Sequence, residues 1–138
     1  MAITQQQALE VVQRAKSLLQ KGWIKGAWAR DHNKKHVDPW DESACEFCVE
    51  GAFIGAAHFE PNAEEIQTAC VTMFQVANPE FAKDPTKMTK ILAANNPGSH
   101  ITSSSVIPTV NDSHNVTHKQ ILRMCDNTLE FIMRSKWQ

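Results

Sequence analysis

Two pairs of residues have the types and spacing of metal ligands. Cys45 and Cys48 form a C-x-x-C pair, and His114 and His118 form an H-x₃-H pair. Thiolate and imidazole bind zinc, but the pairs are separated by far more than the roughly 12–15 residues of a zinc finger. Both cysteines also fall within a helix that we expect over residues 44–59, whereas a redox-active pair opens a helix after a strand. The sequence therefore predicts packed thiols, with no metal and no cofactor.

Cysteine and histidine side chains could also combine as a nucleophile and its base, because the two groups need only meet in space. The residues available for this are Cys48, Cys70, Cys125, His58, His114 and His118, with Asp112 as a further candidate. The sequence lacks the local signatures of serine hydrolases, phosphate-binding loops, zinc proteases and dinucleotide-binding folds. A small Cys/His- or Asp-dependent hydrolase or transferase is therefore the alternative hypothesis, and no catalytic residue is assigned.

Charge is unevenly distributed over residues 21–50. A basic stretch precedes an acidic one, and the charged residues are, in order, Lys21, Lys25, Arg30, His32, Lys34, Lys35 and His36, then Asp38, Asp41, Glu42, Glu46 and Glu50. One interpretation is a pair of solvated surfaces that partly neutralise each other. The other is a site for a small anionic ligand, nucleotide-like or phosphorylated, where Arg30 lies beside the ring of Trp23 or Trp28.

A third polar group, Asn111-Asp112-Ser113, stands just before the last expected helix. Side chains of Asn and Asp at such positions close turns and cap unpaired amides, which is a sufficient structural role. The same side chains could instead line a pocket together with the basic stretch.

Hydrophobic periodicity predicts the helices that must position these groups. The first is expected over residues 5–21, where apolar residues form one broad stripe. Thr4 and Gln7 have the spacing of a capping box, and Gly22 suits the C-terminal end.

A second helix is expected over residues 44–59, with Asp41 or Ser43 as its N-cap. Gly51 and Gly55 lie inside it, and each mid-helix glycine costs about 1 kcal/mol relative to alanine. Such a cost is explained if another backbone packs closely against that face. The backbone could come from the same chain or, in a homo-oligomeric structural protein, from a second copy.

Between these helices the periodicity changes. Residues 23–29 have the composition of a short strand, residues 31–34 that of a turn, and residues 35–37 that of a returning strand. We expect a two-stranded hairpin that packs against the helices, because an isolated hairpin is marginally stable.

The remaining elements complete one expected domain over residues 1–138. They are a third helix over residues 63–77, a short helix over 85–94, a long loop over about 95–115, and a last helix from 116 or 118 to about 135 with Thr117 and Gln120 as a second capping box. The predicted fold class is mainly α, a compact bundle of about four to five helices with one small β-hairpin between the first two.

Composition bounds the class of protein. The 138 residues fit a single domain, and a net charge of −1 argues against general nucleic-acid binding, which relies on an excess of Lys and Arg. No apolar run approaches the roughly 20 residues that span a membrane. The first residues lack the pattern of a signal peptide, so a cytoplasmic protein with reduced cysteines is expected.

Several short motifs occur in a distinctive order. They are Gly22-Trp23-Ile24-Lys25-Gly26-Ala27, Ala29-Arg30-Asp31, Val37-Asp38-Pro39, Cys48-Val49-Glu50-Gly51-Ala52-Phe53 with Ala56-Ala57, and Asn111-Asp112 with Thr117 downstream. Together they resemble a small uncharacterised family, a domain of unknown function found in bacteria and phages. The resemblance spans most of the chain, although Val110 stands where that family has Trp.

The resemblance implies no activity, but it singles out positions that could converge on one ligand site. These are Trp23, Arg30, Asp31, Cys48, Asn111 and Asp112. The leading hypothesis is a phage-associated, non-enzymatic binding or interaction module that engages a protein partner or a small anionic ligand.

Overall fold

The computed structural model describes residues 3–78, 116–135 and 137, and it confirms the predicted mainly helical fold with a small antiparallel sheet between the first two helices. The elements are α1 (Gln5–Lys21), β1 (Ala29–Arg30), β2 (Glu46–Phe47), α2 (Val49–Ala57), α3 (Ala63–Ala77) and α6 (His118–Arg134). The helix expected over residues 85–94 and the loop expected over residues 95–115 lie outside the described residues. Among the described helices, none combines the length and the apolar character needed to cross a bilayer.

The two longest helices begin at the predicted capping boxes. Thr4 Oγ1 accepts a hydrogen bond from Gln7 N at 3.0 Å, and Gln7 Oε1 accepts one from Thr4 N at 3.2 Å. Thr117 and Gln120 repeat this exchange at the start of α6, at 3.2 and 2.8 Å. These local bonds satisfy amides that no earlier turn can reach, which explains why sequence alone located both helix starts.

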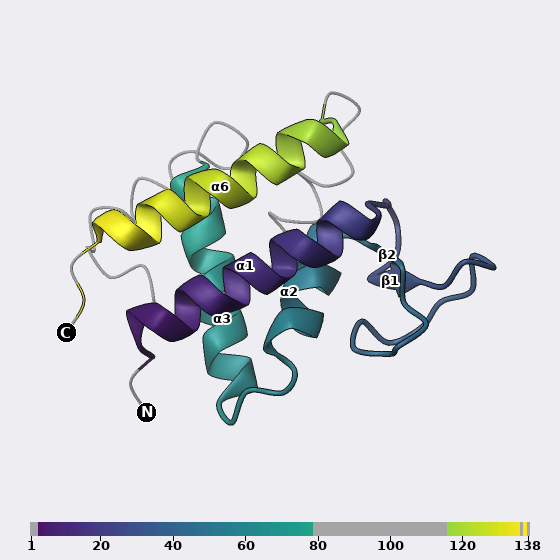
Figure 1. The fold of residues 1–138 in the computed structure, drawn as a ribbon, viewed down its shortest axis with the longest axis horizontal. Coiled ribbons are helices and arrows are strands. Elements are labelled where there is room, and N and C mark those ends of the chain that lie inside the picture. Colours follow the sequence, from purple (N-terminus) through teal and green to yellow (C-terminus); the bar gives the residue numbers. More distant parts are fainter. Residues whose placement is uncertain (1–2, 79–115, 136, 138) are drawn as a thin grey trace.

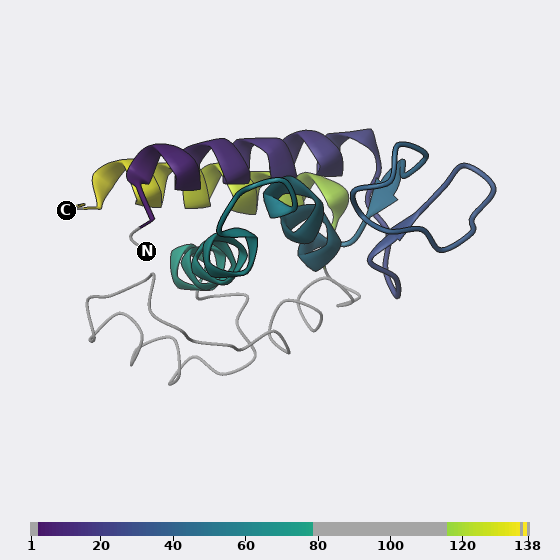
Figure 2. The same ribbon diagram turned by 90° about the horizontal axis from the view of Figure 1, so that it is seen from below.

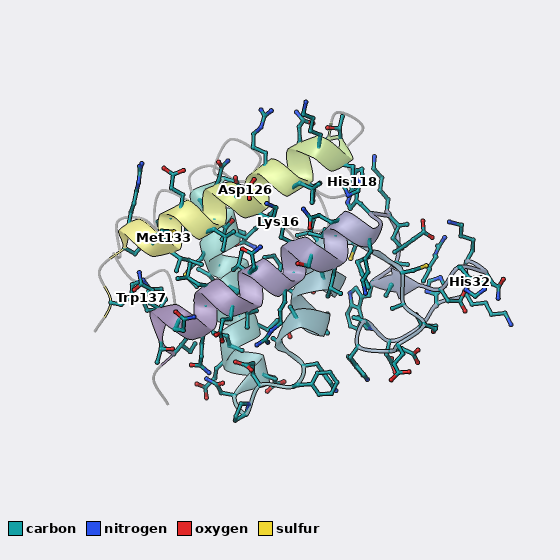
Figure 3. The ribbon with its side chains drawn as sticks, viewed as in Figure 1. Lys16, His32, His118, Asp126, Met133 and Trp137 are labelled. Carbon is teal, nitrogen blue, oxygen red and sulfur yellow. The ribbon has the colours of Figure 1, made fainter. Side chains whose placement is uncertain are left out.

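α1 and α6 lie side by side and run in opposite directions (Figures 1 and 2). Three polar contacts follow their length: Gln5 Nε2 to Ile132 O at 3.0 Å, Lys16 Nζ to Asp126 Oδ1 at 2.6 Å, and His118 Nε2 to Leu19 O at 2.6 Å. Figure 3 shows Lys16 and Asp126 facing each other between the helices. The histidine Nε2 carries the proton in the last contact, because a carbonyl oxygen only accepts.

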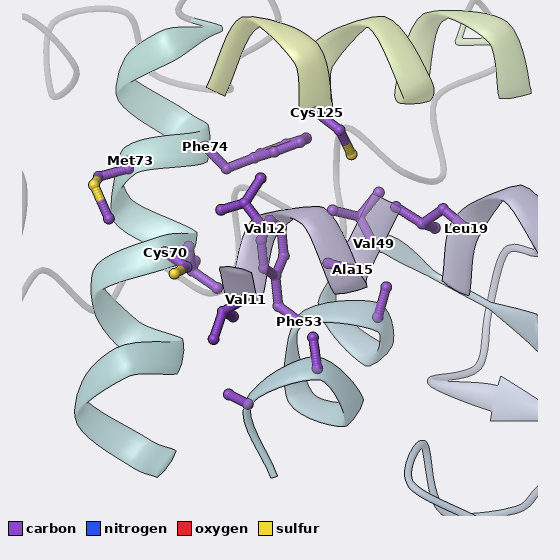
Figure 4. Packing of buried hydrophobic residues seen from close by; sticks show 14 of the residues in the cluster. Val11, Val12, Ala15, Leu19, Val49, Phe53, Cys70, Met73, Phe74 and Cys125 are labelled. Carbon is purple, nitrogen blue, oxygen red and sulfur yellow. The ribbon is translucent and has the colours of Figure 1, made fainter. Parts of the chain in front are cut away.

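The hydrophobic core lies where α2 and α3 pack against this pair of helices (Figures 2 and 4). Phe53 of α2 and Phe74 of α3 meet edge to face, with ring centroids 5.6 Å apart and an interplanar angle of 73°. Both rings are fully buried, together with Val11, Val12 and Leu19 of α1. Burial of these apolar side chains is the main stabilising term, and the polar contacts between α1 and α6 set their register.

The segment between α1 and α2, residues 22–48, is called the β unit below. β1 pairs with β2 in antiparallel register, Ala29 opposite Phe47 and Arg30 opposite Glu46. The returning strand expected over residues 35–37 makes only a bridge from His36 to Arg30, on the other edge of β1. The prediction of a small antiparallel β element is confirmed, but its main partner strand comes from residues that we assigned to a helix.

The second helix therefore begins at Val49, five residues later than the sequence indicated. Backbone amides just before it are used by the β unit instead: Cys45 N donates to Arg30 O at 3.0 Å, and Cys48 N donates to Trp28 O at 3.2 Å. The expected N-caps are wrong for the same reason. Asp41 Oδ1 accepts from Ser43 N at 2.8 Å and closes a turn, while Cys48 caps α2.

The close backbone approach expected at Gly51 and Gly55 is confirmed within the chain. A Cβ atom on Gly51 would lie 1.9 Å from the carbonyl oxygen of Trp28, and one on Gly55 would lie 2.7 Å from that of Pro39. Both distances are below any tolerated contact, so only glycine fits without a backbone shift. The chain itself therefore occupies this face of α2, which leaves no need for a second copy to explain the glycines.

A buried amide joins the end of α3 to α6. Asn78 is 2% exposed, and its Nδ2 donates to Phe74 O at 2.8 Å and to Met124 O at 3.2 Å. Its Oδ1 accepts from Asn127 Nδ2 at 3.0 Å. Because both polar atoms of the amide have hydrogen-bond partners, Asn78 can be buried at the end of α3.

Candidate functional site

Arg30 is the residue of the β unit with the clearest unmet hydrogen-bonding capacity. Its backbone lies between Glu46 on one side and His36 on the other. Its guanidinium Nε is buried and has no hydrogen-bond partner among the described residues. The carboxylate of Glu46, which lies directly across the sheet, is held by Lys34 Nζ at 2.6 Å. A buried N–H without an acceptor is costly, so this edge of the guanidinium is suited to donate a hydrogen bond to a ligand oxygen.

The loop that follows Arg30, residues 31–36, is called the basic loop. Asp31 shapes it, since its Oδ1 accepts from Asn33 N at 2.9 Å and from Lys35 N at 3.0 Å. Lys34 adopts a left-handed backbone conformation with φ 66°. The β unit projects beyond the ends of the helices, with His32 at its tip (Figures 1 and 3). Asp31 is thus a turn-forming residue that places the cationic side chains in solvent.

Trp23 packs inward from the start of the β unit. Its ring stacks on His118 with centroids 6.0 Å apart and an interplanar angle of 25°, and Lys25 Nζ lies 5.6 Å from its centre. Its backbone forms a parallel bridge with Phe47. The stack of Trp23 on His118 therefore joins the β unit to α6, which is a positioning role. Trp28, by contrast, is 54% exposed.

Cys48 occupies the N-cap of α2, so its expected mid-helix position is wrong. Its Sγ accepts a hydrogen bond from Gly51 N at 3.2 Å, and the residue is 8% exposed. The strand pairing of Phe47 with Ala29 forces the backbone to stay extended up to this residue, which is why the helix starts here. The thiol replaces the hydroxyl or carboxylate that usually caps a helix.

The structure places four of the six expected site residues in the β unit. Trp23, Arg30, Asp31 and Cys48 all lie within residues 22–48, whereas Asn111 and Asp112 lie outside the described residues. Asp31 and Cys48 have the local structural roles given above, and Trp23 packs on His118. Convergence of all six residues on one site stays a prediction.

Among the described residues, the other groups considered for nucleophilic chemistry are engaged or unreactive, whereas His114 and Asp112 lie outside those residues. Burial raises the pKa of the Cys70 thiol and that of the Cys125 thiol to about 12, so both are protonated near neutral pH. His58 stacks on Trp40, and His118 donates to Leu19 O. Within residues 3–78, 116–135 and 137, no three His, Cys, Asp or Glu side chains are placed to hold a metal ion.

The thiols are expected to separate into two classes under alkylation. In the native protein, iodoacetamide at mildly alkaline pH should modify the partly exposed Cys45 while Cys70 and Cys125 stay unmodified, because their thiolate form is disfavoured and access is blocked. Peptide mass spectrometry measures the extent at each site. Modification in urea is the control and should reach every cysteine. Equal native rates at Cys70 and Cys45 would contradict the buried position of Cys70.

Glu50, the last residue of the acidic stretch, is a half-buried carboxylate. It lies in the first turn of α2, where the helix dipole favours a negative charge. Burial nevertheless raises its pKa above the ordinary value of 4.5, so desolvation outweighs the dipole. The folded state therefore binds the proton more tightly than the unfolded chain does, and the stability contributed by Glu50 falls as the pH rises through its folded pKa.

Glu50→Gln is accordingly expected to raise the melting temperature more at about pH 7 than at about pH 4, because the variant carries no charge to desolvate. Thermal unfolding of both proteins at the two pH values measures the difference. Glu42→Gln, at an exposed position, is the matched control and should show no such trend. A Glu50→Gln effect that is the same at both pH values would contradict the assignment.

These features define a small, mainly helical domain with a projecting β unit that carries the basic loop. Residues 3–130 match a family of unknown function, DUF6197, and the chain belongs to this family. The resemblance to an uncharacterised domain family is thus confirmed. Neither the curated proteins nor the solved structures contain a match.

Proposed function

We propose that the protein is a non-enzymatic binding module whose ligand site is the base of the basic loop, and that it takes a small anionic ligand with phosphate or carboxylate oxygens. The observation that carries this proposal is the buried Nε of Arg30, which has no acceptor among the described residues. A guanidinium recognises such oxygens through paired N–H donors. The motif resemblance extends the proposal to a phage-associated or bacterial role.

Charge around Arg30 supports an anionic ligand. Lys35, His32 and His36 belong to the same exposed loop, and Lys34 neutralises Glu46, the acid directly across the sheet. The ligand would therefore meet cationic groups at the rim and one partly buried guanidinium at the base. A few convergent charges of this kind suit a small ligand, since nucleic-acid binding needs an extended basic surface.

The test is a titration with inorganic phosphate and with adenosine monophosphate, followed by the ¹⁵N-edited NMR signals of the arginine Nε–H groups. We expect the Arg30 signal to move with saturation, and Arg30→Lys to weaken binding by about tenfold or more, because lysine keeps the charge but loses the paired donors. Phosphate alone tests the anion class, and the nucleotide tests whether a ring adds affinity.

Arg14→Lys is the matched control. Arg14 is a half-exposed arginine of α1 that donates to Ala56 O at 3.0 Å, so its replacement removes a guanidinium outside the β unit. Equal weakening by Arg14→Lys and Arg30→Lys would indicate general charge attraction. An Arg30 Nε–H signal that does not respond to either anion would refute the proposal.

A further inference from the structure

Three aromatic side chains form a second surface, separate from the basic loop. Trp40 and His58 stack face to face, with centroids 4.0 Å apart and an interplanar angle of 4°. The ring of Phe59 meets His58 edge-on, with centroids 4.7 Å apart and an angle of 84°. Trp40, His58 and Phe59 are called the aromatic patch. Trp40 comes from the loop between β1 and β2, whereas His58 and Phe59 follow α2 directly.

The rings of the aromatic patch pack against one another and are still exposed to solvent. Phe59 is 79% exposed, Trp40 is 38% exposed, and His58 is also exposed, although Phe47, Phe53 and Phe74 are fully buried. Large apolar side chains that are exposed together indicate a contact surface. Because the stacking already fixes the rings, a partner would pay little side-chain entropy to bind them.

The charges beside the aromatic patch are carboxylates. Asp38, Asp41 and Glu42 surround Trp40 in the sequence and are exposed, and the turn is closed by Asp41 N donating to Asp38 O at 2.9 Å. Hydrogen bonds from Ser43 lower the pKa of Asp41, which keeps this carboxylate ionised.

The guanidinium of Arg14, which lies near the end of α2, already has partners. Arg14 donates to Ala56 O at 3.0 Å and lies 3.7 Å from Glu60, so its guanidinium faces the helix terminus and an acid. The aromatic patch therefore offers ring faces near exposed carboxylates.

We propose that the aromatic patch binds an arginine-bearing, basic segment of a partner protein. A guanidinium that stacks on Trp40 can also donate hydrogen bonds to carboxylates such as those of Asp38 and Glu42, which lie two residues from Trp40 in the sequence. An arginine side chain can use both the ring and the carboxylates of this surface. An apolar partner could use only the ring. The inference concerns a different surface and a ligand of opposite charge from the proposed function, and it does not depend on it.

Charge complementarity also argues against the other occupants. An anionic lipid surface would be repelled by Asp38, Asp41 and Glu42. In the basic loop of a second copy, Lys34 is paired with Glu46 and Asp31 folds back on the backbone. A flexible basic segment of another protein has neither restriction.

The probe is a fluorescein-labelled peptide in which arginine alternates with glycine, measured by fluorescence anisotropy at physiological salt. We expect saturable binding that Trp40→Ala weakens by at least about tenfold and that Trp40→Phe largely retains, since a ring face remains. Asp38→Asn with Glu42→Gln should also weaken binding. Trp28→Ala is the matched control, because it removes an exposed tryptophan outside the aromatic patch.

The remaining outcomes would overturn the proposal. Equal binding of a glycine-serine-leucine peptide would indicate a general apolar surface, and equal weakening by Trp28→Ala would indicate non-specific attraction. Self-association in sedimentation that Trp40→Ala abolishes, with no peptide binding, would assign the patch to a second copy. The NMR signal of the Trp40 indole N–H reports direct contact, and a signal unmoved by the saturating peptide would exclude the site. Circular dichroism of each variant verifies that it is folded.

Discussion

Gly51→Ala is expected to destabilise the protein by about 3 kcal/mol or more, which is the upper range for forcing an extra methyl group into a packed interior. The added Cβ would lie 1.9 Å from the carbonyl oxygen of Trp28, and that oxygen also accepts the hydrogen bond of Cys48 N. Backbone atoms cannot rotate away as a side chain can. The substitution must therefore separate α2 from the β unit. Urea denaturation followed by circular dichroism measures the free energy of unfolding.

Helix propensity alone predicts that Gly51→Ala would stabilise the protein, because alanine is favoured over glycine by about 1 kcal/mol inside a helix. Gly55→Ala, whose Cβ would lie 2.7 Å from Pro39 O, should give a smaller loss and supplies a graded measurement if Gly51→Ala does not fold. Ser17→Ala on the exposed face of α1 is the control for propensity. A Gly51→Ala variant as stable as the parent would show that Trp28 and α2 do not meet as described.

Asn78→Ala should cost about 2–3 kcal/mol, since it leaves several buried polar groups without their partner. The amide of Asn78 donates to carbonyls of both α3 and α6, and Asn127 donates to it in turn. Its loss also removes a direct bond between the two helices. The free energy of unfolding in urea is again the measurement, and it should fall with little change in the denaturant slope.

Asn33→Ala provides the matched comparison. Asn33 lies in the exposed basic loop, so its substitution should change the free energy of unfolding by no more than about 0.5 kcal/mol. Similar losses from both variants would mean that the buried amide of Asn78 contributes nothing beyond an ordinary surface residue. Asn127→Ala should fall between them, because it removes one donor of the network.

Sequence reasoning located the elements whose ends are set locally. The capping boxes at Thr4 and Thr117 involve residues three apart, so both helix starts could be predicted. The start of α2 could not, because it depends on the pairing of β2 with β1, whose residues are far apart in the chain and too few to show alternation. The helix expected over residues 44–59 therefore contained Cys48, which in the structure is the N-cap.

The candidate site was predictable to the same limited extent. Uneven charge singled out Arg30 and its neighbours, but the missing acceptor at Arg30 Nε follows from tertiary burial. The aromatic patch could not be predicted from the sequence, because β2 and α2 separate Trp40 from His58 along the chain. Charge type can be read along a chain, whereas unmet hydrogen bonds and exposed stacks are properties of the assembled fold.

The antiparallel contacts between α1 and α6 also dictate when the core can close during synthesis. Gln5 reaches Ile132 across a sequence separation of 127 residues, and His118 reaches Leu19 across 99. The apolar stripe of α1 therefore has no complete partner until α6 has left the ribosome. Contacts of such high separation slow folding, because a long loop must close before they form. The face of α1 that packs on α6 therefore stays without its partner after α2 and α3 have been made, so that the core is completed only when α6 docks.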